Sequence, residues 1–250
     1  MQGFQVVIIV GFKLAKIVSN VLEKSMDKAK MDEGLRSFLK SIIKYLIKII
    51  VLITAASVME IPMTTFIALL SAAGLAVGLA LKDSLSNFAA GVMILVSKPF
   101  LVGDFIETQG YMGTVKQIQL LYTIMNTPDN RRVMIPNSEV AGSKLINFTA
   151  EETRRVDMTF GVSYSDDIYK VKEILTRLVD NHPLTLKDPE PIIKVMSHGD
   201  SSVNFVVRVW CERANYWTIF FDFQEQVKVE FDKENISIPF PQRDVHLYQK

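Results

Sequence analysis

Residues 61–81 read IPMTTFIALLSAAGLAVGLAL and carry no charged side chain. As an α-helix that rises about 1.5 Å per residue, this stretch is about 31 Å long, close to the hydrocarbon thickness of a bilayer. A buried core helix is the alternative, but so long an uncharged run is rare in soluble folds. The stretch therefore predicts a transmembrane helix.

Two further apolar segments come before this helix. Residues 42–59 contain Lys44 and Lys48 near their start, on one helical face from which both ammonium groups can reach the membrane interface. Residues 3–22 are a weaker candidate, because their uncharged part ends at Phe12. The predicted transmembrane domain, residues 1–98, thus holds three membrane helices, at residues 3–22, 42–59 and 61–81.

Basic residues set the expected orientation of these helices. The predicted loop between the first two helices holds several of them, namely Lys24, Lys28, Lys30, Arg36 and Lys40. The connection at residues 60–62 holds none. Because cytoplasmic loops are enriched in Lys and Arg, the N-terminus is expected outside and the C-terminal part in the cytoplasm.

The third helix is dense in small residues, which favours close contact between helices over contact with lipid. On a helical wheel these residues form two opposite flanks, Ala72, Ala76 and Ala80 on one and Gly74 and Gly78 on the other. The Gly flank of one copy can pack against the Ala flank of the next. Such a heterologous contact closes into a ring, so we expect a homo-oligomer.

Leu75 and Leu79 lie between the two flanks and are expected to point at the axis of the ring. Stacked rings of leucine make a narrow apolar constriction that blocks ions by dewetting. These two leucines are therefore the predicted pore gate. The alternative is ordinary small-residue packing inside a monomeric transporter.

The stretch after this helix begins with Lys82 and Asp83 and continues with the uncharged residues 84–97. That run is too short to span a bilayer and predicts an interfacial or docked helix. Gly91 is its weak point and the expected hinge. On the wheel, Lys82 of one subunit is expected to approach Asp83 of the next below the gate, unless both are simply solvated.

Several motifs together resemble the signature of the small-conductance mechanosensitive channel family. They are AAGLAVGLAL (72–81), SLSNFAAGV (84–92), KPFLVGDFIE (98–107), MIPNSEV (134–140), LINFT (145–149), NFVVRVW (204–210) and IPFPQRDV (238–245). The resemblance implies a heptamer with a hollow cytoplasmic vestibule and side portals. Family members usually have Gln-Gly where this chain has Lys82-Asp83, which leaves the main kink to Gly91.

The remainder of the chain reads as soluble structure. Short β runs separated by turns predict an all-β domain over residues 99–150, a small barrel of the Sm-like type. Strands and helices alternate in residues 151–241, which predicts an α+β domain. Residues 242–250 are expected to supply a C-terminal strand near 245–248, which the resemblance places in a β barrel shared by all subunits.

No catalytic constellation is evident in the sequence. P-loop, HExxH and GxSxG patterns are missing, and His182, His198 and His246 are scattered. We therefore expect no enzyme activity, no cofactor and no metal. The net charge of +1 gives no support for nucleic-acid binding. The lone Cys211 fits a reducing compartment.

These observations and the resemblance together predict a mechanosensitive channel in the bacterial inner membrane. It would be opened by membrane tension, release ions and small osmolytes on hypo-osmotic shock, and respond to the surrounding membrane lipids. The alternative is a membrane-anchored secondary transporter or scaffold. A transporter would need polar groups near the midplane, where residues 61–81 offer only Thr64, Thr65 and Ser71.

Overall fold

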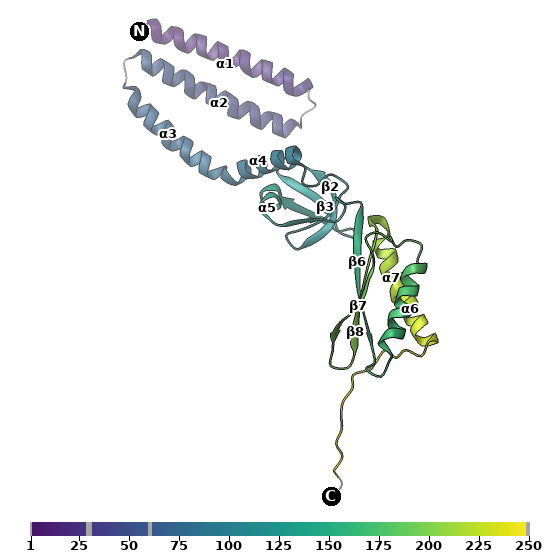
Figure 1. Ribbon diagram of the computed structural model, residues 1–250. Helices are drawn as coiled ribbons and strands as arrows, with labels where there is room; N and C mark the ends of the chain where they lie inside the picture. Colours follow the sequence, from purple (N-terminus) through teal and green to yellow (C-terminus); the bar gives the residue numbers. More distant parts are fainter. Residues whose placement is uncertain (1, 29–31, 60–61, 249–250) are drawn as a thin grey trace. The chain divides into compact units, whose positions relative to one another are not determined.

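The computed structural model describes residues 2–28, 32–59 and 62–248, which divide into two compact units between Asp83 and Ser84. The first unit is helical and the second contains both sheets of the chain (Figure 1). Some predicted positions lie outside the described residues. They are Lys30 of the predicted basic loop, Glu60, Ile61 at the start of the predicted third helix, and the last two residues of the predicted C-terminal segment 242–250. The predicted fold class, apolar helices followed by β and α+β domains, is confirmed.

Helices α1 (Gln2–Lys28) and α2 (Glu33–Val58) pack against each other in the first unit. Their closest approach is at Gly11, where an added Cβ would lie 2.6 Å from both methyl carbons of Val51. Ala55, one turn further along α2, is fully buried. Helix α2 begins after Asp32, whose carboxylate accepts hydrogen bonds from the backbone N–H groups of Gly34 and Leu35. Small residues therefore allow two apolar helices to lie close together.

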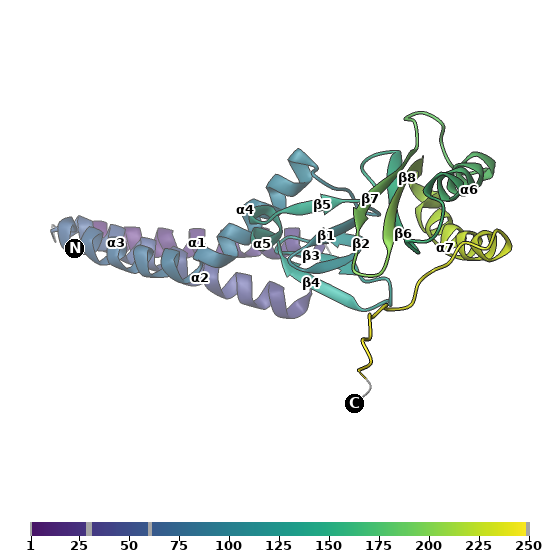
Figure 2. The same cartoon turned by 60° about the horizontal axis from the view of Figure 1, so that its bottom comes forward.

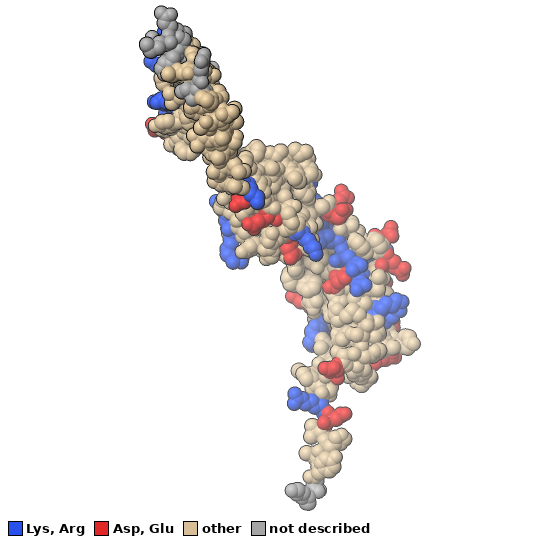
Figure 3. Space-filling model, turned by 90° about the vertical axis from the view of Figure 1, so that its left-hand side faces the viewer, with Lys and Arg blue, Asp and Glu red and all other residues tan. Residues whose placement is uncertain are grey.

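Helix α3 spans Met63–Ala80 and begins directly after Pro62, whose fixed φ suits a helix start. Among the described residues, two helices, α2 and α3, have the length and composition to cross a membrane. The face of the helical unit in Figure 3 is accordingly mostly uncharged. The first predicted crossing lies in α1, so the topology of three crossings stays a prediction.

The β domain is a five-stranded antiparallel sheet. Its strands are β1 (Phe105–Thr108), β2 (Tyr111–Ile118), β3 (Tyr122–Asn126), β4 (Arg132–Pro136) and β5 (Leu145–Asn147), in the order β4-β3-β2-β1-β5. The β1–β2 hairpin turns at Gln109 and Gly110, both with positive φ, as a two-residue turn requires. Gly113 lies inside β2, where an added Cβ would clash with the Asn126 carbonyl oxygen.

Helices α4 (Lys82–Ser97) and α5 (Asn137–Gly142) lie beside this sheet (Figure 2). Ile94 of α4 and Val140 of α5 enter the same buried cluster as the strand residues Ile106, Val115 and Met125. Sequence analysis missed α5 and β5, because runs of six and three residues carry too little periodicity to be read.

The α+β domain has a three-stranded antiparallel sheet with one face covered by two helices (Figure 1). Its elements are β6 (Thr153–Val162), α6 (Ile168–Asn181), β7 (Ile192–His198), β8 (Val203–Glu212), the short helix η1 (Arg213–Asn215) and α7 (Tyr216–Lys233), with sheet order β6-β8-β7. The core contains alternate residues of β6 and every fourth residue of α7 from Ile219 to Phe231. The buried Cys211 belongs to the same core.

The two domains of the second unit meet around Arg154. Its guanidinium carbon lies 3.9 Å from the ring centroid of Tyr216 and 5.0 Å from that of Phe148. A planar cation between two aromatic faces holds the end of the β domain against the start of α7.

The C-terminal segment after Ile236 forms no strand in the described part, which ends at Tyr248. Val245, Leu247 and Tyr248 are exposed by 74, 89 and 91%. A strand needs a second strand for its backbone hydrogen bonds, and in the described single chain this segment pairs with none. The predicted strand at 245–248 is therefore absent here, and the shared barrel stays a prediction.

Asp104 fixes the connection from α4 to β1. Its carboxylate accepts hydrogen bonds from the Leu101 N–H at 2.9 Å and the Asn147 amide at 2.8 Å. Burial by itself raises the pKa of Asp104, but these hydrogen bonds, one from Thr149 and the charge of Arg213 together lower this pKa below its usual value. The ionised form therefore stabilises the folded domain.

We expect Asp104→Asn to lower the Tm by about 2–6 °C at neutral pH, since it removes a charged acceptor. The pKa of Asp104 is lower in the folded state than in the unfolded state, so its ionised form stabilises the fold at any pH above the unfolded-state pKa. This stabilisation is lost as the pH falls through the folded-state pKa. The Tm difference between wild type and variant should therefore shrink on acidification, as measured by thermal unfolding. Glu151→Gln, at an exposed carboxylate, is the control. A Tm difference that is constant with pH would contradict this role.

Candidate pore helix and gate

Helix α3 has no buried residue in the described chain. Leu75 and Leu79, the predicted gate, are each 66% exposed, and Val77 between them is 57% exposed. A fully apolar helix that its own chain leaves uncovered must be covered by lipid or by other chains. A single chain thus supplies one helix of a candidate pore and cannot surround the pore by itself.

The small residues of α3 are not required by contacts inside the chain. An added Cβ at Gly74 or Gly78 would meet no atom of the structure within 4 Å. Gly11, by contrast, is in steric contact with Val51. Ala72, Ala76 and Ala80 are exposed as well. Within the described part of the chain, no contact therefore requires glycine at these two positions, and the packing of these five residues against other subunits stays a prediction.

The helical path is interrupted at Leu81, between α3 and α4. The Leu81 N–H still bonds to the Val77 carbonyl, and α4 then starts at Lys82. Gly91 was predicted to carry the main kink, but α4 continues through Gly91 to Ser97. The interruption in this structure thus lies at Leu81, and a hinge at Gly91 stays a prediction about another conformation.

Close packing explains why α4 has a glycine at position 91. Gly91 is buried against the β domain, and an added Cβ would lie 2.5 Å from Asn137 Nδ2 and 2.9 Å from the Leu120 carbonyl oxygen. Ala90 and Ile94 are buried beside it. Residues 84–97, which we had grouped with the membrane segment, therefore pack as part of the β domain.

Two asparagines hold this contact together. Asn137 is fully buried: its Oδ1 accepts a hydrogen bond from Thr123 Oγ1 at 2.9 Å, and its Nδ2 donates to the carbonyls of Gln119 and Leu120. Asn87 of α4 accepts hydrogen bonds at Oδ1 from the backbone N–H of Ser138 at 2.9 Å and from its Oγ at 2.8 Å. The two asparagines lie in the motifs SLSNF and PNSEV, and nothing in the sequence indicates that these motifs meet.

Lys82 and Asp83 form the first turn of α4. A carboxylate in the first turn interacts favourably with the helix dipole, which gives Asp83 a role inside its own chain. An ion pair between Lys82 of one subunit and Asp83 of the next requires a second copy and stays a prediction. In the described residues, no group of three His, Cys, Asp or Glu side chains is placed to hold a metal ion.

Three family descriptions match consecutive parts of this chain. They are "Mechanosensitive ion channel, transmembrane helices 2/3" over residues 41–82, "Mechanosensitive ion channel, beta-domain" over 83–150, and "Mechanosensitive ion channel MscS, C-terminal" over 156–238. A small-conductance mechanosensitive channel of Edwardsiella ictaluri is 41% identical over 98% of this chain and 85% of its own length. The chain belongs to the MscS family of mechanosensitive ion channels.

Solved structures of the MscS family agree with this assignment. The closed-state crystal structure of Helicobacter pylori MscS matches with a TM-score of 0.90 and 31% identity, over 99% of this chain and 98% of that one. Arabidopsis thaliana MSL1 matches with a TM-score of 0.76 over 95% of this chain and 88% of that one, and at 18% identity it shows the shared fold alone.

The contact at Gly91 gives a direct test. We expect Gly91→Ala to push α4 away from Asn137 and Leu120, with an overpacking cost of about 1–3 kcal/mol. Backbone amides of α4 should then exchange hydrogen at least severalfold faster, and the Tm should fall. Gly142→Ala is the matched control, because its added Cβ meets open space. Equal exchange rates in α4 for both variants would show that the contact does not hold the helix.

Proposed function

We propose that this MscS-family protein is a channel opened by membrane tension, which releases ions and small solutes when the cell swells. The observation that supports this most strongly is α3, an uncharged helix without a buried residue in the described chain, which carries Leu75 and Leu79 between two small-residue flanks. In a ring of such helices the leucines would form an apolar constriction, and tension would favour the wider, open ring.

The proposal includes a position in the membrane. The helices α1, α2 and α3 would cross the bacterial inner membrane with the N-terminus outside, and both sheet domains would lie in the cytoplasm. The loop predicted to hold the basic residues is shorter in the structure, and Lys24, Lys28, Arg36 and Lys40 lie instead in the end of α1 and the beginning of α2. Basic residues at these neighbouring helix ends support this orientation. No enzyme activity is part of the proposal, because ion release along a gradient needs none.

The deciding experiment is patch-clamp recording with graded suction after reconstitution into pure lipid. Tension alone should open the wild type. Leu75→Ser and Leu79→Ser should lower the opening tension, because each replaces an apolar side chain of the constriction by a polar one. Removing a leucine side chain from water is worth about 1.5–3 kcal/mol, and this hydrophobic free energy is lost at each substituted position. Leu70→Ser is the control, because position 70 lies about 180° around the helix from position 79.

A wild type that stays silent under tension, or that moves a substrate without tension, would point instead to the transporter or scaffold alternative. An equal fall in opening tension for all three Ser variants would reject Leu75 and Leu79 as a specific gate.

We further propose a homoheptamer, in which the Gly74 and Gly78 flank of one α3 packs against the Ala flank of its neighbour. Native mass spectrometry in detergent should give one species at seven times the mass of the chain. Gly78→Leu should shift this population to smaller species, because the side chain would separate adjacent helices, whereas Gly142→Ala should not. A monomeric or dimeric wild type would overturn this assembly.

A further inference from the structure

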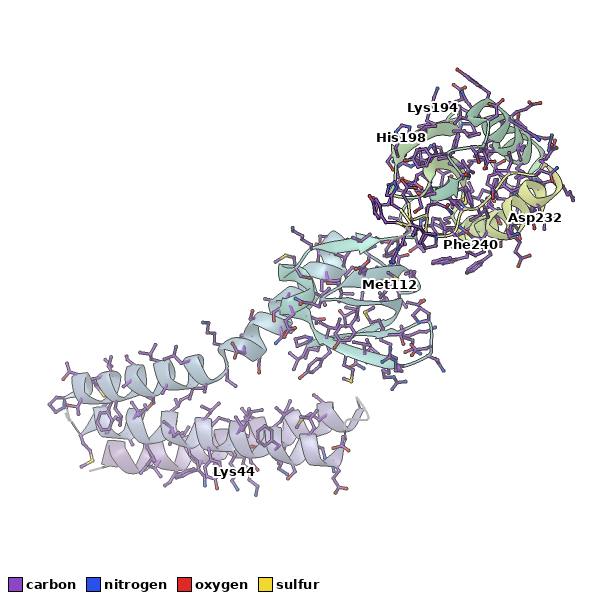
Figure 4. All side chains as sticks on the ribbon, turned by 90° about the horizontal axis from the view of Figure 1, so that it is seen from below. Lys44, Met112, Lys194, His198, Asp232 and Phe240 are labelled. Carbon is purple, nitrogen blue, oxygen red and sulfur yellow. The ribbon has the colours of Figure 1, made fainter. Side chains whose placement is uncertain are left out.

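The chain passes from the β domain to the α+β domain through residues 148–152, between the end of β5 and the start of β6. Figure 4 marks the two domains by Met112 of β2 and by Lys194 of β7. A linker with few contacts would leave the two domains free to move relative to each other. Residues 147–149 instead contact groups of both domains, so we call these three residues the joint.

On the side of the β domain, the joint holds the connection from α4 to β1. The Asn147 amide Nδ2 donates to Asp104 Oδ2 at 2.8 Å, and the same oxygen accepts from the backbone N–H of Leu101 at 2.9 Å. Thr149 donates from its N–H and from its Oγ1 to Asn147 Oδ1, at 2.9 Å each. Thr149 Oγ1 also accepts from the N–H of Phe105 at 3.0 Å. Because α4 ends shortly before Leu101, these bonds tie the joint to the end of α4.

On the side of the α+β domain, Arg213 reaches back to the joint. Its guanidinium Nη1 donates to the carbonyl oxygen of Thr149, and its backbone N–H donates to the carbonyl oxygen of Glu152 at 2.9 Å. Hydrogen bonds from a charged donor are stronger than those between neutral groups. Arg213 is the first residue of η1, which leads directly into α7. The start of α7 is therefore bound to the joint.

Arg154, at the start of β6, supports the joint from the same domain. Its guanidinium lies over the rings of Tyr216 and Phe148, and Phe148 is the middle residue of the joint. The Phe148 N–H donates to the Phe105 carbonyl oxygen at 2.9 Å, and the two rings lie 5.8 Å apart. Two arginines of the α+β domain thus act on three consecutive residues.

The hydrogen bonds form one continuous path. It runs from the end of α4 through Asp104, Asn147 and Thr149 to Arg213. Asn147 uses its amide oxygen and its amide nitrogen in separate links. A shift of α7 would therefore move Thr149, and with it the groups that hold Leu101. Energetic coupling between the two ends is what distinguishes such a path from ordinary packing of neighbours.

We propose that Arg213 is a positioning residue for channel opening, which couples the α+β domain to the end of α4 through Thr149 and Asp104. With this path intact, α4 moves only together with the α+β domain, and the opening tension includes the cost of moving that domain. Without the path, α4 moves on its own and the channel opens at a lower tension. The inference rests on the tension-gated opening given under the proposed function.

The first test is hydrogen exchange of the full-length protein. The N–H of Leu101 bonds to Asp104 and that of Phe105 to Thr149, so these two amides report the far end of the path. Arg213→Gln should speed their exchange about tenfold, as loss of a hydrogen bond from a charged donor allows. Arg213→Lys should stay near the wild-type rate, because an ammonium group can still donate to the Thr149 carbonyl oxygen.

Arg177→Gln is the matched control for this exchange measurement. Arg177 forms ion pairs with Glu230 at 3.3 Å and Glu234 at 3.1 Å, near the other end of α7. This variant therefore also removes an arginine contact to α7 but leaves the joint intact. Exchange at Leu101 and Phe105 should equal that of the wild type.

The second test is patch-clamp recording of the same variants in pure lipid. Arg213→Gln should open at a lower tension than the wild type and than Arg177→Gln. If Asp104 and Arg213 act along one path, combining Asp104→Asn with Arg213→Gln should shift the opening tension by less than the sum of the two single shifts. Unchanged exchange at Leu101 and Phe105 in Arg213→Gln, an equal effect of Arg177→Gln, or additive shifts would overturn the coupling.

The two experiments also separate this inference from the proposed function. A wild type that stays silent under tension would reject the proposed function, and the exchange rates would still decide whether the path exists. A wild type that opens under tension, with the same opening tension in Arg213→Gln, would reject the role of Arg213 alone.

Discussion

Helix α3 carries no charged residue, and none of its residues is buried within the described chain. Water cannot cover so apolar a surface without a large free-energy cost, so a bilayer or other chains must cover it. The other features of the molecule follow from this constraint. In the proposed channel, α1 and α2 would anchor the chain in the membrane, the sheet domains would keep the subunits in register, and a connection would join the two parts.

The connection is α4, and its packing gives it a definite role. Ile94 belongs to the buried cluster of the β domain, and Gly91 lies so close to Asn137 and Leu120 that any larger side chain would clash. Asn87 adds a polar contact with Ser138. A helix held by apolar burial and by hydrogen bonds is a firm support, whereas the break at Leu81 is a natural place for the chain to change direction.

The pair of helices α1 and α2 shows how small residues permit close packing. Gly11 and Ala55 allow the two helices to approach closely, as is typical of membrane helix pairs.

The amino-acid sequence by itself determined the fold class and the elements with strong periodicity. The uncharged run ending at Leu81 predicted α3, and the alternation of strands and helices over residues 151–241 predicted the α+β domain that holds β6, β8 and α7. Short elements such as α5 and β5 were not predicted, because a few residues are too short to show a periodic pattern. The tertiary structure alone decided that α4 packs on the β domain and that Asn87 meets Ser138 across 51 positions of the chain. It also decided that the break falls at Leu81, while α4 continues as a helix through Gly91. A glycine in a sequence can serve a bend or a close contact, and only its neighbours in space show which; at Gly91, Asn137 and Leu120 leave no room for a side chain.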